Sequence, residues 1–106
     1  MRLLTFILMA LTSQSALAGS AAPGKVVNPI VNRAGIFFFS QTGVRSAIPT
    51  CEVYNRWAVD VNTPRGQSMM SLILTAYSQG KNVSIAGTGE CGVAGDTEGI
   101  EFIIVN

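Results

Sequence analysis

The stretch GTGECG, Gly87–Gly92, has the G-x-G-x-x-G spacing of a dinucleotide-binding loop. Such a loop binds a pyrophosphate only where a helix begins, because the backbone N–H groups at the helix N-terminus contact the phosphates. The residues that follow, VAGDTEG, favour a loop over a helix. We therefore expect an ordinary loop between two strands at this point, and no nucleotide cofactor.

Residues for acid–base, nucleophilic or metal chemistry are few. The sequence has no histidine and no C-x-x-C pair. Glu90, Asp96 and Glu98 could form an acidic pair, but carboxylates on a loop are usually solvated. Ser71 and Ser84 have no evident base to activate them. We expect a non-enzymatic protein without a metal or a cofactor.

Tyr54 and Arg56 are the candidates for a binding surface. They alternate with Trp57 in the stretch EVYNRWAVD, which predicts a strand from Glu52 to Asp60. In such a strand Val53, Asn55, Trp57 and Val59 face inward, and Tyr54 and Arg56 face outward. Tyrosine and arginine side chains suit stacking on a sugar or an interface. An ordinary solvated face, with Arg56 paired to Asp60 or Glu52, is the alternative.

The sequence predicts five strands and one helix, which would position the candidate residues Tyr54 and Arg56. Gly19–Gly24 is expected to be a loose leader, and a short strand within Val44–Ile48 is an option. Thr63, Pro64 and Gly80 have the types expected of a helix N-cap, first position and C-terminal αL residue, which predicts a helix of about sixteen residues. The order strand-strand-strand-helix-strand-strand predicts a mainly β, OB-fold-like five-stranded barrel. The expected strands are Lys25–Asn32, Ile36–Phe39, Glu52–Asp60, Asn82–Ala86 and Ile100–Val105.

The predicted helix is apolar on more than one side. Met70, Ile73, Leu74 and Tyr77 follow the i, i+3, i+4, i+7 spacing of a buried stripe. Three further apolar residues flank this stripe and form a candidate oligomer face: Met69, Leu72 and Ala76.

The first eighteen residues have the pattern of a bacterial signal peptide. Arg2 precedes the apolar stretch Leu3–Leu11, and Ala16–Ala18 matches a small-x-small cleavage pattern. The apolar stretch is too short for a membrane span, which needs about 20 residues. Cleavage after Ala18 would leave one domain, residues 19–106, in the periplasm or secreted.

Export also bears on the cysteines and the charge. Cys51 and Cys91 are the two cysteines, and a pair in a small exported domain is most simply one disulfide. Removal of Arg2 leaves six basic residues of the seven, against six acidic residues. A net charge of zero gives no long-range attraction to phosphate backbones or anionic membranes, so nucleic acid is not the expected partner.

The stretches Cys51–Cys91 and Gly95–Asn106 resemble small exported bacterial proteins related to the B subunits of subtilase cytotoxin and typhoid (pertussis-like) toxin. The shared features are the arginine–tryptophan strand, a helix that opens with Thr-Pro and runs into L-T-A, the Gly80-Lys81 turn and the closing G-T-G-x-C. The resemblance implies an OB-fold, a pentameric ring with helices around a pore, and binding to cell-surface glycans. The alternative function is a periplasmic structural or protein-interaction domain without a sugar site.

Overall fold

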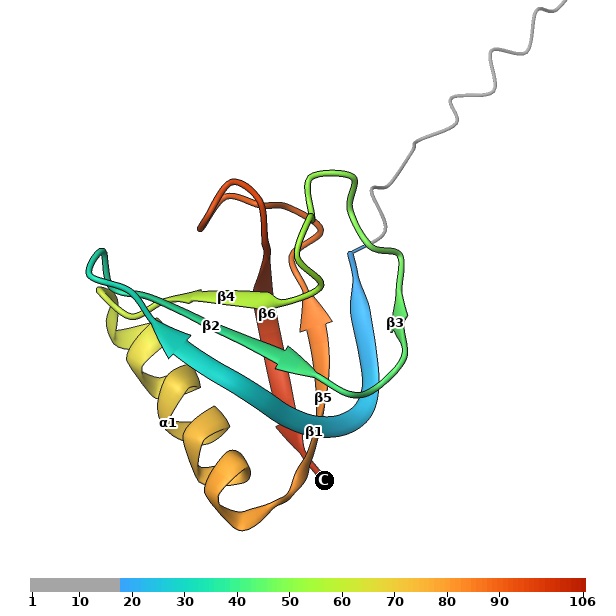
Figure 1. The fold of residues 1–106 in the computed structure, drawn as a ribbon, viewed down its shortest axis with the longest axis vertical. Coiled ribbons are helices and arrows are strands. Elements are labelled where there is room, and N and C mark those ends of the chain that lie inside the picture. Colours follow the sequence, from blue (N-terminus) through green and yellow to red (C-terminus); the bar gives the residue numbers. More distant parts are fainter. Residues whose placement is uncertain (1–17) are drawn as a thin grey trace, which may run out of the picture.

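The computed structural model describes residues 18–106, so the predicted signal peptide lies outside the described residues except for Ala18. Six strands and one helix follow one another along the chain (Figure 1). They are β1 (Ser20–Val31), β2 (Ile36–Gln41), β3 (Arg45–Ser46), β4 (Trp57–Asp60), α1 (Pro64–Gln79), β5 (Asn82–Gly87) and β6 (Glu98–Val105).

The strands pair in a ring. β1 is antiparallel to both β2 and β5, β2 is antiparallel to β4, and β5 is antiparallel to β6. The ring is completed by a parallel pairing of β4 with β6, at Trp57–Glu98 and Ala58–Gly99. The two-residue β3 adds to the edge of β1. This ring, with the helix between β4 and β5, confirms the predicted OB-fold-like architecture, although bulges make the barrel irregular.

β1 belongs to both halves of the ring because it bends sharply (Figure 1). Its register with β5 shifts between Ala21 and Gly24, where the chain passes very close to the β2–β3 connection. A Cβ on Gly24 would lie 2.2 Å from the backbone nitrogen of Gly43, so a side chain does not fit there. The loose leader expected over Gly19–Gly24 is therefore wrong, because Gly19 is buried and β1 begins at Ser20. The small residues of this segment suggested flexibility, but here Gly24 allows the backbone of β1 to lie against the backbone at Gly43.

The ends of α1 agree with the prediction. The Thr63 hydroxyl accepts a hydrogen bond from the Gly66 N–H at 3.0 Å, and Gly80 has a left-handed φ of 63°. These two features begin and end a helix of 16 residues, as expected. Among residues 18–106, no helix is long and apolar enough to span a membrane.

The buried face of α1 differs from the predicted stripe. Ile73 and Ala76 are buried, at 0% and 1% exposure, and Met69 and Met70 pack partly against the core. Leu74 and Tyr77, expected inside, are 38% and 49% exposed. The buried face contains the small residues Gly66 and Ala76, and the helix lies so close to β4 that a Cβ on Gly66 would be 1.7 Å from the Asp60 carbonyl oxygen.

The strand predicted over Glu52–Asp60 is shorter than expected. β4 begins only at Trp57, and Asn55, expected to face inward on the strand, has a left-handed φ of 50° that interrupts extended structure. Val53, also expected inside, is 68% exposed. Trp57 and Val59 do face the core, together with residues from the other main strands and the helix: Ala21, Val26, Phe37, Phe39, Ile73, Val83, Ile85 and Ile100.

The predicted disulfide is present. Cys51 and Cys91 are joined with an S–S distance of 2.07 Å, and their Cα atoms are 6.2 Å apart. The bond ties the loop before β4 to the loop between β5 and β6. Both loops lie at the top of the molecule in Figure 1, away from α1. It therefore holds in place the segment that carries Tyr54 and Arg56.

Candidate functional site

A groove with a volume of about 530 Å³ lies beside the first two strands. Its lining residues come from the bulged part of β1, from β2 and from the segment before β4. The lining residues are Asn28, Pro29, Ile30, Phe38, Phe39, Ser40, Tyr54 and Arg56. The groove thus contains both residues that the sequence put forward for a binding surface.

Arg56 stacks on two aromatic rings in this groove. Its guanidinium carbon lies 3.8 Å from the ring centroid of Phe38 and 4.6 Å from that of Tyr54. A guanidinium over an aromatic face at such a distance is attracted by the ring quadrupole. Phe38 is 8% exposed, whereas Tyr54 is 60% exposed. The Arg56 guanidinium therefore contacts the buried Phe38 ring and also the exposed Tyr54 ring.

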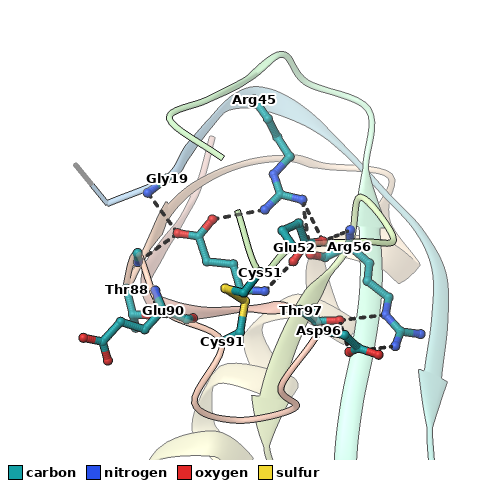
Figure 2. The surroundings of a disulfide bond; sticks show 12 residues. Gly19, Arg45, Cys51, Glu52, Arg56, Thr88, Glu90, Cys91, Asp96 and Thr97 are labelled. Atoms are coloured by element: carbon teal, nitrogen blue, oxygen red, sulfur yellow. Dashed lines mark hydrogen bonds and ion pairs between the residues drawn. A yellow bond between two sulfur atoms is a disulfide. The ribbon is translucent and has the colours of Figure 1, made fainter. Parts of the chain in front are cut away.

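The Arg56 side chain is also fixed from its other side (Figure 2). Its Nε donates to the Thr97 hydroxyl at 3.0 Å, and its Nη2 lies 3.5 Å from a carboxylate oxygen of Asp96. The Thr97 side chain is fully buried and donates in turn to Asp96 at 2.9 Å. The guanidinium is thus held in one position, and a neighbouring carboxylate compensates its charge.

Two of the segments that form the groove contain unusual backbone. Asn28 and Asn55 have φ values of 52° and 50°, in the left-handed region that asparagine tolerates better than most residues. Asn28 lies within the β1 bulge, where the register with β2 shifts between Val27 and Ile30. The Ser40 hydroxyl donates to the Asn55 carbonyl at 3.3 Å and so joins β2 to the segment before β4. Bulges of this kind redirect side chains and are frequent beside binding sites.

The structure places Tyr54 and Arg56 together, but in an irregular segment before β4 rather than on the outer face of a strand. The other lining residues Asn28, Phe38 and Ser40 come from other strands and were not predicted from the sequence. The consecutive Phe37–Phe39 offered one signal, since alternate residues of a strand point to opposite faces. Phe37 and Phe39 join the core, which leaves Phe38 on the side of Arg56.

A buried ionic cluster lies beside the disulfide (Figure 2). Arg45 forms ion pairs with Glu52 at 3.3 Å and with Glu98 at 3.1 Å. The three side chains are 5%, 2% and 0% exposed, respectively. The Arg45 guanidinium also lies 4.0 Å from the Trp57 ring centroid. The expectation that Glu98 is solvated on a loop is therefore wrong, because a distant arginine pairs with it inside the fold.

Glu52 connects this cluster to the groove. Its carboxylate accepts hydrogen bonds from the backbone N–H groups of Arg56 at 2.8 Å and of Glu98. Arg45 also donates to the Arg56 carbonyl at 3.2 Å and to the Asn55 side chain at 3.4 Å. The segment that carries Tyr54 thus has its backbone fixed by buried charges as well as by the disulfide. Sequence spacing gave no sign of these contacts.

A second hollow, of about 470 Å³, lies where β4 and β6 stop pairing, next to the first turn of α1. Its charged residues, Asp60, Arg65 and Glu101, surround apolar side chains that include Met69 and Val93. Its lining contains no aromatic ring and neither of the two residues put forward for a binding surface, Tyr54 and Arg56. We therefore take the groove of Tyr54 and Arg56 as the candidate site.

The candidate oligomer face is not a single exposed surface. Ala76 is 1% exposed and Met69 packs against the core, so these two residues serve the barrel. Leu72 is 42% exposed and is the one of the three that remains on the outside. The physical reason is that α1 packs against the barrel through the helix face that contains Met69 and Ala76.

Residues 18–106 contain no group of three or more histidine, cysteine, aspartate or glutamate side chains placed to hold a metal ion. Comparisons with protein-family models, with curated proteins and with solved structures gave no match to this chain. The resemblance to toxin B subunits therefore stands on the sequence motifs alone.

Proposed function

We propose that the protein is an exported, non-enzymatic binding module whose ligand is a glycan, bound in the groove of Tyr54 and Arg56. The observation that carries this proposal is the position of the groove. It is lined by the bulged part of β1, by β2 and by the irregular segment that leads into β4; β2 and β4 are the second and third strands of the OB-fold order. OB-fold proteins bind oligosaccharides and oligonucleotides on the face of these two strands.

The chemistry of the groove favours a sugar over a nucleic acid. A flat, exposed tyrosine ring can contact the C–H face of a pyranose, and Ser40 and Asn28 offer polar groups beside it. Single-stranded nucleic acids require in addition a positively charged groove that follows the phosphates. Among the described residues that line the groove, Arg56 is the one cation, and it is paired with Asp96. The groove therefore suits a ligand without a row of phosphates.

Export is part of the proposal. The disulfide is compatible with an oxidising compartment, and the leader pattern supports removal of residues 1–18. The resemblance to toxin B subunits further supports a ring of identical subunits, a pentamer in those proteins. Leu72, Leu74 and Tyr77 leave apolar surface on α1 for such contacts. Light scattering on the domain tests this: a monomer at all concentrations would contradict the ring.

The second candidate function is a structural or protein-interaction domain. It is supported by two apolar residues at the end of β1: Ile30, which lines the groove and is 55% exposed, and Val31, which is 59% exposed. Exposed apolar residues of this kind suit a protein partner. Under this alternative the domain shows no affinity for sugars.

A glycan array with the purified domain tests the proposal, with Tyr54→Ala as the probe variant. Phe102→Ala is a matched control, because Phe102 is 52% exposed and does not line the groove. We expect binding to a defined set of glycans, weakened about tenfold or more by Tyr54→Ala, as for a central aromatic contact. The control should bind normally. Absence of binding to every glycan, or an equal loss in the control, would contradict the sugar site.

A further inference from the structure

The backbone nitrogen of Gly19 lies inside the fold, against the buried cluster. Gly19 is buried, whereas Ala18 is exposed. The Gly19 nitrogen donates to the Glu98 carboxylate at 2.9 Å, and the same oxygen accepts from the Gly89 N–H at 2.9 Å (Figure 2). The other Glu98 oxygen pairs with Arg45. The junction expected for signal cleavage thus contacts one of the least accessible carboxylates of the domain.

The side-chain charges of this cluster do not balance. Glu52 and Glu98 contribute two negative charges, and Arg45 contributes one positive charge. The remaining donors to these carboxylates are neutral backbone N–H groups of Gly19, Arg56, Gly89 and Glu98. Burial of an uncompensated charge is costly. A further positive group near Glu98 would make the cluster neutral.

We propose that cleavage between Ala18 and Gly19 supplies that group. Hydrolysis of this peptide bond by an endopeptidase consumes one water molecule, leaves a carboxylate on Ala18 and gives Gly19 a free amine, which takes up a proton at neutral pH. The resulting ammonium lies at the position of the present N–H group and forms an ion pair with Glu98. Processing therefore completes the buried cluster and stabilises the mature domain. This inference rests on the proposed cleavage site.

The identity of residue 19 agrees with this role. A Cβ at Gly19 would lie 2.2 Å from one Glu98 carboxylate oxygen and 2.6 Å from the other, so a side chain would displace the carboxylate. The Gly19 carbonyl accepts a hydrogen bond from the Gly87 N–H at 2.7 Å, which fixes the residue at the end of the barrel. A Cβ on Gly87 would also meet Glu98, at 2.0 Å. Two glycines thus leave room for the carboxylate beside the chain terminus.

Three purified chains that differ only at the N-terminus test the ion pair. All contain every described strand and the helix. The first begins at Gly19, the second begins at Ala18, and the third begins at Gly19 with an acetyl group. The second chain keeps the charge but moves it to an exposed residue. The third keeps the N–H donor in place but removes the charge.

We expect the chain that begins at Gly19 to be the most stable. The equilibrium constant for unfolding, from urea titrations, should be larger by about tenfold or more in the other two chains, as expected for loss of a charged hydrogen bond. In a Glu98→Gln background the three chains should become alike. Three equal unfolding constants with Glu98 present, or differences that persist in Glu98→Gln, would overturn the proposal.

A second measurement avoids the risk that Glu98→Gln does not fold. Brief acetylation of the folded chains, read by mass spectrometry, compares the terminal amine with Lys25 and Lys81. The Gly19 amine should react at least about tenfold more slowly than the Ala18 amine, because the ammonium is buried and paired. Equal rates for the two amines would contradict the ion pair.

Export of the full chain tests the cleavage separately. The mass of the protein recovered from the periplasm or medium should correspond to a start at Gly19. A different start, with the three purified chains still behaving as expected, would refute the processing step and leave the ion pair intact. A start at Gly19 with three equally stable chains would refute the ion pair and leave the proposed export intact.

Discussion

Replacement of Ile73 by alanine tests which face of α1 the barrel buries. Ile73 is fully buried, and removal of a buried isoleucine side chain costs about 2–5 kcal/mol, from lost transfer energy and the cavity left behind. Leu74 is the matched control, because it is the next residue of the same helix and is 38% exposed. It has less buried surface to lose, so we expect Leu74→Ala to cost roughly 1 kcal/mol.

Urea unfolding, followed by Trp57 fluorescence, measures both costs. For a domain of this size the free energy of unfolding falls by about 1 kcal/mol per molar urea. We therefore expect the midpoint to fall by about 2–5 M for Ile73→Ala and by about 1 M for Leu74→Ala. The slopes should not change. A larger loss for Leu74→Ala would refute the buried face of α1 and restore the stripe predicted from helical spacing.

Two further changes test the loops and the helix start. Replacement of both Cys51 and Cys91 by alanine should lower the free energy of unfolding by about 4 kcal/mol, because the cysteines are 40 residues apart and the bond restricts the unfolded chain. Calorimetry should show a lower melting temperature, and an unchanged melting temperature would contradict a stabilising role of the disulfide. Gly66→Ala should destabilise the domain, because the added Cβ would lie 1.7 Å from the Asp60 carbonyl oxygen. This outcome is opposite to the helix preference of alanine, which is about 1 kcal/mol better than glycine within a helix. Gly92→Ala, with open space at its Cβ, is the control and should unfold at the same urea concentration as the parent chain. A more stable Gly66→Ala variant would show that the helix can move away from β4.

Tyr54 and Arg56 show how much of the candidate site local sequence could predict. Their residue types indicated a binding surface, and the structure places both in the groove. Their support was not predictable, because Asn28, Phe38 and Thr97 come from segments distant along the chain. Spacing within a single strand carries no information about such neighbours. The burial of Glu98 was not predictable for the same reason, because its partner Arg45 lies 53 residues away along the chain.

The sequence alone determined the order of the elements, the bounds of α1 and the disulfide. These features depend on local signals: hydrophobic periodicity, the capping residues Thr63 and Gly80, and a single pair of cysteines. Tertiary structure decided which side chains face the core. The register of β6 with β5 shifts between Ala86 and Gly87, so Ile100 and Ile103 both pack inward while Phe102 is exposed. Simple alternation would have put Ile100 and Phe102 on one face. Such a bulge arises from the pairing of two strands, which neither strand encodes by itself.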